Sequence, residues 1–117
     1  MKIAIPRFGE RVAPCFEYSA TIAIFEIQRK RVIDQKDFTL QSTRSFDRLR
    51  LLKDQEVEVL ICGGIQDRFE DMVLAAGIRV ISWVSGDVET LLDDFLNGRL
   101  VSGSGRVCNT DDPTKKR

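Results

Sequence analysis

The segment Val57-Glu58-Val59-Leu60-Ile61-Cys62-Gly63-Gly64-Ile65 joins a short apolar run to a pair of glycines. The run is rich in β-branched residues and too short for a helix, which is typical of a strand buried on both faces inside a parallel sheet. The glycines predict a sharp turn into a helix that begins near Gln66 or Asp67. Cys62 then falls at the C-terminal edge of a central strand, where open α/β sheets place their binding crevices. The alternative is that Cys62 is a small buried thiol with a packing role.

Length and composition indicate an ordinary globular domain. The chain has 117 residues, enough for one domain with one core. Eighteen basic residues balance eighteen acidic ones, so no net charge favours nucleic acid or membrane partners. The apolar runs are too short to cross a bilayer, and the N-terminus lacks the apolar region of a signal peptide. Three cysteines without paired spacing argue against a secreted disulfide framework, so we expect a cytoplasmic protein.

The apolar patterns before and after this segment predict the other elements of the fold. The expected strands cover residues 2–6, 21–27, 31–38, 57–61 and 78–84. Three helices are expected: the first follows a cap at Thr43 or Ser45, the second covers about residues 67–76, and the third follows a cap at Asp87. Within the first helix, Phe46, Leu49 and Leu52 should share the buried face. Residues 7–17 hold a glycine and a proline without a clear period, so we expect a structured loop there.

The order of these elements predicts the topology of the sheet. Strands separated by helices should be parallel with right-handed crossovers, whereas residues 21–38 should form an antiparallel hairpin. We therefore expect residues 1–101 to form one α/β domain with a five-stranded mixed sheet of order 3-2-1-4-5, in which strand 2 is antiparallel. With helices on both faces, this is a ribonuclease H-like three-layer arrangement. Residues 102–117 are rich in small and charged residues and are expected to be a flexible tail.

Four motifs in this order resemble a known family. They are residues 1–6 with the loop 11–14, residues 60–65, residues 75–80 running on to 86–89, and residues 95–100. In order and spacing they are similar to the dinitrogenase iron–molybdenum cofactor biosynthesis family, small proteins that bind or carry cofactor precursors containing iron and sulfur. The resemblance implies a non-catalytic carrier of an iron–sulfur cluster or an iron–molybdenum cofactor precursor. It also implies a partner protein that donates or accepts the metallocluster.

The loop after the first strand differs from that of the relatives. The resemblance implies a histidine in this loop, which many relatives carry as a cluster ligand, whereas this chain has no histidine at all. Cys15 occupies the equivalent place. Because thiolate is the usual ligand of iron–sulfur clusters, the replacement keeps a soft metal ligand in the loop.

The cysteines can also be placed from the expected topology. Cys15 and Cys62 would follow adjacent parallel strands about 5 Å apart, so the two thiols are candidates to flank one crevice. Gly63 and Gly64, with the helix N-terminus that follows, would favour the Cys62 thiolate and an anionic cluster. Cys108, on the tail, could close over the site as a third metal ligand. The alternative is a regulatory protein–protein interaction domain with structural cysteines and no bound metal.

Several catalytic sites lack their residues in this sequence. A ribonuclease H-like nuclease needs acidic residues on its central strands, and residues 2–5 and 57–61 contain only Glu58. A dinucleotide site needs Gly-x-Gly-x-x-Gly after a strand, and residues 63–68 have only the leading glycines. A Cys–His pair is excluded because histidine is absent. We therefore expect a binding protein and not an enzyme.

Overall fold

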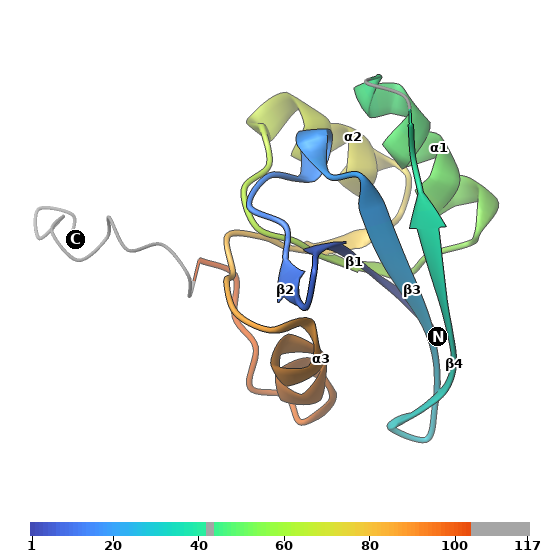
Figure 1. Cartoon of the computed structure of the whole chain (residues 1–117), viewed down its shortest axis with the longest axis vertical. Helices are drawn as coiled ribbons and strands as arrows, with labels where there is room; N and C mark the ends of the chain where they lie inside the picture. The colour runs from blue at the N-terminus through green and yellow to red at the C-terminus, as the bar shows by residue number, and fades with distance from the viewer. Residues whose placement is uncertain (42–43, 104–117) are drawn as a thin grey trace, which may run out of the picture.

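This computed structural model describes residues 1–41 and 44–103 of the chain (Figure 1). These residues contain six strands, three α-helices and one 3-10 helix. The strands are β1 (Lys2–Phe8), β2 (Arg11–Val12), β3 (Thr21–Gln28), β4 (Arg31–Thr39), β5 (Val59–Ile61) and β6 (Arg79–Ile81). The helices are η1 (Phe16–Tyr18, 3-10), α1 (Ser45–Asp54), α2 (Asp67–Ala75) and α3 (Val88–Leu96).

The sheet is mixed, and β1 lies at its centre. Its order is β4-β3-β1-β5-β6, and β2 pairs with β1 outside this path. The hairpin partner β3 is antiparallel to both of its neighbours, as the sequence predicts, whereas β5 is parallel to β1 and to β6. The predicted count of five strands was wrong by one. The sixth strand, β2, is only two residues long, too short to show a periodic pattern, and it folds back on the end of β1.

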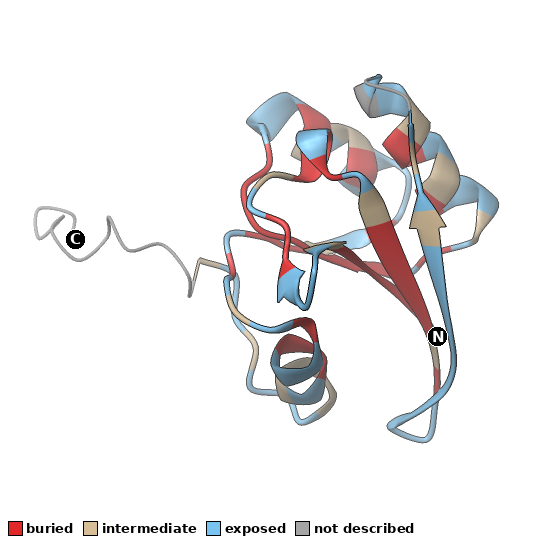
Figure 2. Cartoon of the chain, in the orientation of Figure 1, coloured by how far each residue is buried: buried red, intermediate tan, exposed pale blue. Residues whose placement is uncertain are grey.

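Helices cover both faces of the sheet, so that the domain has three layers (Figures 1 and 2). Side chains alternate between the two faces along each strand. In β5, Val59 and Ile61 pack in the cluster beneath α3, whereas Leu60 packs in the cluster beneath α1 and α2. β5 is therefore buried on both faces, as its composition indicates.

The first strand is longer than predicted. It continues through Pro6 to Phe8 and pairs with β3 along most of its length. Pro6 lacks a backbone N–H, but its carbonyl accepts a hydrogen bond from the N–H of Ala13 at 2.8 Å. Proline therefore does not end the strand here. Residues 7–17, predicted as a loop, contain the end of β1, all of β2 and the start of η1.

The predicted helix caps need correction. Arg44 is the residue before α1, and no side-chain capping bond is formed there; Ser45 is already inside the helix, and Thr43 lies outside the described residues. Asp87 does precede α3, but its side chain forms an ion pair with Arg11 at 3.6 Å and makes no capping hydrogen bond. Phe46, predicted on the buried face of α1, is 64% exposed, and its ring packs edge-on against Phe69 of α2 with the ring centroids 6.2 Å apart.

The C-terminal end of the described chain is attached to the sheet. The hydroxyl of Ser102 accepts a hydrogen bond from the N–H of Ser82, and the N–H of Gly103 donates to the carbonyl of Ser82. The rest of the predicted tail, residues 104–117, lies outside the described residues. Within the described ranges, none of the helices combines the length and apolar character needed to span a lipid bilayer.

Candidate functional site

The loop after β1 lies against the turn after β5. The N–H of Phe16 donates to the carbonyl of Gly64 at 2.8 Å, and the N–H of Gly64 donates to the carbonyl of Pro14 at 2.7 Å. These two bonds form a parallel bridge between Cys15 and Gly64. The predicted crevice at the C-terminal ends of β1 and β5 is therefore narrowed by direct backbone pairing.

The two glycines permit this close approach. A Cβ atom on Gly63 would lie 2.6 Å from the carbonyl oxygen of Ala13, which real structures do not tolerate. A Cβ atom on Gly64 would lie 3.0 Å from the carbonyl oxygen of Pro14 and 3.2 Å from the ring of Trp83. Close packing therefore requires glycine at position 63, whereas a methyl group at position 64 would force Pro14 or Trp83 to move by a few tenths of an ångström.

Cys62 is fully buried in the apolar layer between the sheet and α2. It has no exposed surface and belongs to the same cluster as Phe69 and Val73. Burial raises the pKa of its thiol far above the ordinary value, and the charges of Glu70 and Glu17 raise it further. Burial of Cys62 therefore favours its neutral thiol, contrary to the prediction that the start of α2 favours the thiolate.

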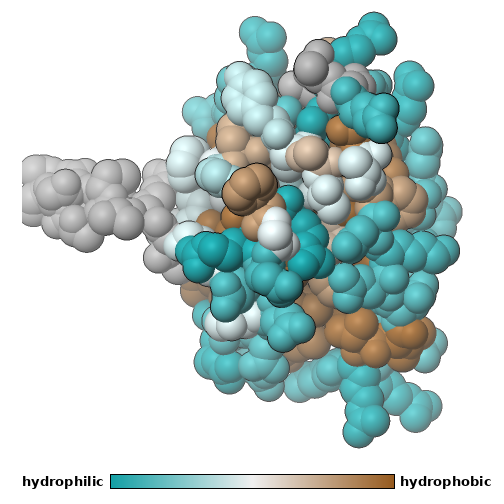
Figure 3. All heavy atoms as spheres, viewed as in Figure 1, coloured by the Kyte–Doolittle hydropathy of each residue, from teal (hydrophilic) through white to brown (hydrophobic). Residues whose placement is uncertain are grey.

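Cys15 is the partly exposed thiol of the described chain. It lines a hollow of about 450 Å³ together with residues of β1, of the loop that follows and of the start of β3, namely Arg7, Phe8, Gly9, Ala13, Pro14, Tyr18, Ser19, Ala20 and Thr21. Phe8 and Tyr18 are 79% and 76% exposed. The surface view in Figure 3 shows apolar and hydrophilic side chains intermixed on the face that carries β2 and η1. The hollow therefore combines a thiol, a cation and exposed aromatic rings.

Glu17 connects Cys15 to α2, a role that the sequence did not indicate. Glu17 is buried, with 4% of the residue exposed. Oxygen Oε1 accepts a hydrogen bond from Sγ of Cys15 at 3.2 Å, and Oε2 accepts one from the N–H of Gln66, just before α2, at 2.7 Å. Burial, followed by the hydrogen bond and charge of Glu17, raises the pKa of Cys15. Glu17 and Gln66 are 49 residues apart, so no local pattern could reveal the contact.

A second hollow of about 320 Å³ lies on the other side of Pro14. It is lined by Arg11, Val12, Pro14, Gly63, Gly64, Trp83, Val84, Ser85 and Gly86. Trp83 has a positive φ of 60°, which is unusual for a bulky residue, and its N–H donates to the carbonyl of Gly63 at 2.8 Å. Its ring packs over Gly64 and remains 37% exposed.

The predicted ligands therefore occupy different environments. Cys15 reaches the surface hollow, Cys62 is buried beneath α2, and Cys108 lies outside the described residues. The two described cysteines lie at neighbouring strand ends, since Cys15 pairs with Gly64, two residues after Cys62. Among residues 1–41 and 44–103, no three His, Cys, Asp or Glu side chains are grouped so that they could hold a metal ion.

Comparisons with known proteins identify one family model and several solved structures that match this chain. A family model described as dinitrogenase iron-molybdenum cofactor matches residues 1–98. The crystal structure of PH0822 superimposes with a TM-score of 0.82 at 21% identity and covers 89% of this chain and 96% of that one. The crystal structure of MJ0327 from Methanocaldococcus jannaschii superimposes with a TM-score of 0.74 at 21% identity and covers 89% of this chain and 95% of that one.

A third similar structure is the apo form of the orange protein from Desulfovibrio gigas. It has a TM-score of 0.72 at 20% identity and covers 89% of this chain and 93% of that one. At these identities the structural likeness establishes the fold. A comparison with curated protein sequences gave no significant match.

Proposed function

This chain belongs to the dinitrogenase iron–molybdenum cofactor family, and from that membership we propose that it carries a metallocluster related to iron–molybdenum cofactor biosynthesis. The cargo is an iron–sulfur cluster or a precursor of the iron–molybdenum cofactor, and it binds in the hollow lined by Cys15. The observation that carries the proposal is the position of this thiol. Cys15 combines partial exposure with a hollow of about 450 Å³ at the C-terminal end of β1.

Cys15 is the protein ligand in this proposal, and Cys62 has a packing role. A metal–sulfur bond at Cys15 replaces the S–H bond, and the proton is released. The carboxylate of Glu17 already accepts the hydrogen bond of this thiol at 3.2 Å and is the nearest acceptor that the structure shows for the proton. Arg7 lines the same hollow, and its guanidinium, which also pairs with the carboxylate of Asp37 at 3.6 Å, suits a cargo with negative charge.

Attachment through one thiolate suits a carrier. A cluster held by four cysteines is a resident group, whereas a cluster with a single protein ligand keeps its other coordination positions for small ligands or for the next protein. Transfer then requires the exchange of one metal–sulfur bond. We propose that the chain performs no reaction of its own and that it passes the cluster between a donor and an acceptor protein in a reducing cytoplasm.

The test is a visible absorption spectrum after anaerobic reconstitution with iron and sulfide, with and without molybdate, followed by removal of unbound metal. A bound cluster gives colour that stays with the protein, with iron and sulfide in a fixed ratio to the chain. Protein that remains colourless and free of metal in both mixtures would overturn the proposal.

The second candidate is a protein–protein interaction domain without metal. The exposed rings of Phe8 and Tyr18 favour it, because large aromatic side chains at a surface are enriched in interfaces. In a carrier, the same two rings would contact the partner that delivers or receives the cluster. The reconstitution experiment separates the two candidates, since the interaction domain predicts a colourless protein.

A further inference from the structure

The outer edge of β4 is a second surface with specific features. β4 is nine residues long, lies at the end of the sheet order, and pairs only with β3 among the described elements. Nearly all of it is exposed, as Figure 2 shows. A long exposed edge strand presents backbone donors and acceptors that another strand can bind.

The pairing of β4 with β3 determines which of these groups point outward. The N–H of Leu40, just after β4, donates to the carbonyl of Ala20, just before β3. In the same register, Phe38 lies opposite Ile22. Backbone groups alternate in direction along an antiparallel strand. From Asp34 to Leu40 the even-numbered residues therefore bond to β3, and Gln35 and Asp37 direct their N–H and carbonyl groups away from the sheet. The bulge between Asp34 and Val32 interrupts this alternation, and Ile33 is the extra residue that has no opposite residue in β3.

These outward groups and the neighbouring charges fit a second copy of this chain. Two β4 strands related by a two-fold axis at Gln35 would pair antiparallel, with Gln35 opposite Gln35 and Ile33 opposite Asp37. In that register Asp34 of each copy lies opposite Lys36 of the other, at a position where cross-strand side chains approach closely. Two opposite-charge pairs are thus formed by one symmetry operation.

Symmetric registers centred on a charged residue of β4 are disfavoured by charge. An axis at Lys36 places two lysines opposite each other, and an axis at Asp34 or at Asp37 places two aspartates opposite each other. Like charges directly opposite are destabilising. Charges and a bulge on an edge strand usually prevent pairing, and β4 has both. In this sequence, however, the register centred on Gln35 is the symmetric one that pairs opposite charges within β4 without placing like charges opposite each other.

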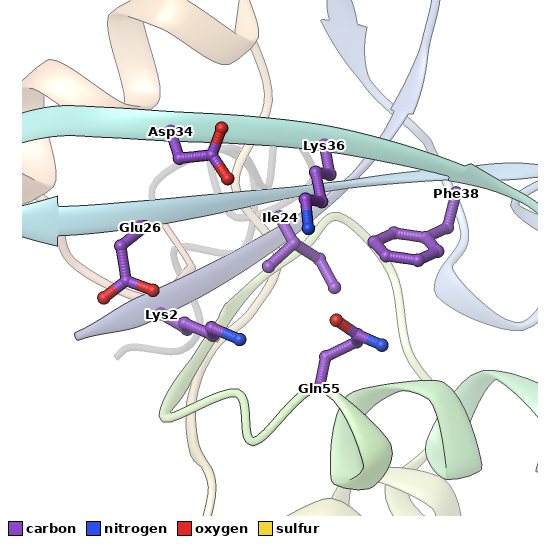
Figure 4. Close-up of a pocket in the computed structure, with 7 residues that line it drawn as sticks. All are labelled: Lys2, Ile24, Glu26, Asp34, Lys36, Phe38 and Gln55. Atoms are coloured by element: carbon purple, nitrogen blue, oxygen red, sulfur yellow. The ribbon is translucent and has the colours of Figure 1, made fainter.

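Asp34 and Lys36 are available for such contacts. Figure 4 shows both side chains on the same face of the hairpin, beside a hollow of about 200 Å³ that also contains Lys2, Glu26 and Gln55. Neither Asp34 nor Lys36 forms an ion pair with another described residue. We propose that the chain forms a symmetric homodimer by antiparallel pairing of β4 with β4 of a second copy, centred on Gln35.

Sedimentation equilibrium of the full chain tests the dimer over about 1 μM to 1 mM, the range of weak to moderate association. The expected mass rises with concentration toward twice the 13.3 kDa of one chain. A mass that stays at one chain over the whole range would overturn the proposal.

Charge exchange tests the register. Asp34→Lys and Lys36→Asp should each raise the dissociation constant more than about tenfold, because each places like charges opposite each other twice. An equimolar mixture of the two variants should associate again as a heterodimer, since one copy then presents two lysines to two aspartates. The control Lys53→Glu changes an exposed charge on α1 and should leave association unchanged.

A further variant keeps the test decisive if a charge variant fails to fold. Gln35→Pro removes the outward N–H at the centre of the interface, and proline is tolerated on edge strands when its nitrogen faces away from the sheet. This variant should be monomeric, with the circular dichroism of the parent protein. A dimer that persists in Gln35→Pro, or a mixture of charge variants that stays monomeric, would place the interface elsewhere and contradict the proposal.

Discussion

The carboxylate of Glu17 accepts a hydrogen bond from the thiol of Cys15 and another from the backbone N–H of Gln66. One buried side chain therefore connects the surface hollow to the start of α2. The bond to Gln66 satisfies a backbone donor that a helix N-terminus leaves unpaired. The bond to Cys15 holds the thiol in its protonated form. Glu17 thus has both a structural effect and an effect on the chemistry of Cys15.

We expect Glu17→Gln to increase the reactivity of Cys15. The negative charge of Glu17 contributes to the raised pKa of this thiol, so its removal lowers the pKa and increases the thiolate fraction at a given pH. The measurement is the rate of alkylation by iodoacetamide as a function of pH, with the modified cysteine identified by mass spectrometry. The midpoint of the Cys15 profile should move to lower pH in the variant. An unchanged or higher midpoint would show that Glu17 does not control the thiol.

Glu17→Ala should also destabilise the fold. It removes the acceptor for the N–H of Gln66 and leaves that donor without its partner, at an expected cost of about 1–2 kcal/mol. Glu17→Gln is the matched control, since its amide oxygen can still accept from Gln66. The free energies of unfolding in urea provide the comparison. Equal stability of the two variants would mean that the hydrogen bond to Gln66 contributes little.

Cys62 should make stability fall at alkaline pH. The pKa of its thiol is raised in the folded chain above the ordinary value of 9.0. Above about pH 9 the unfolded chain therefore releases this proton while the folded chain keeps it, and the free energy of unfolding decreases as pH rises. The contribution approaches about 1.4 kcal/mol per pH unit. Unfolding measured from pH 8 to 10.5 should show a steeper decline for the parent protein than for Cys62→Ala; parallel curves would contradict the burial of Cys62.

Gly63→Ala should destabilise the chain through a collision with the loop that carries Cys15. Gly77→Ala should destabilise it only through backbone strain. The new methyl group at position 63 would lie 2.6 Å from the carbonyl oxygen of Ala13, so the loop that carries Cys15 must move away. Overpacking of this kind costs about 1–3 kcal/mol. Gly77 has open space around the added methyl group but a positive φ of 85°, so its variant isolates backbone strain from collision. A shift of the Cys15 loop should appear as chemical-shift changes in residues 13–16 only for Gly63→Ala.

The strands and helices that have strong local sequence patterns were predictable. The hairpin of β3 and β4, the helix-separated strands β5 and β6 and the stripe of α3 all show their own periodicity. The structure of residues 7–17 could not be predicted in this way, because contacts with distant residues stabilise it. The N–H of Val12 donates to the carbonyl of Gly86 at 3.0 Å, and Phe16 pairs with Gly64.

The position of the candidate site was predictable, but the directions of its thiols were not. Strand order places Cys15 and Cys62 at the same edge of the sheet. Which face Cys62 points to depends on the alternation along β5, where Leu60 and Cys62 both face α2. The sequence also suggested that the helix N-terminus would act on Cys62. In the structure the first free donor, the N–H of Gln66, is occupied by Glu17.

The central claim is that Cys15 holds the metallocluster and Cys62 does not. The most direct test is the iron content per chain of Cys15→Ser and Cys62→Ala after identical anaerobic reconstitution with iron and sulfide, with circular dichroism to verify the fold of each. We expect Cys62→Ala to retain the iron content and visible spectrum of the parent protein, and Cys15→Ser to lose most of both. Full iron content in Cys15→Ser, or its loss in a folded Cys62→Ala, would contradict the assignment.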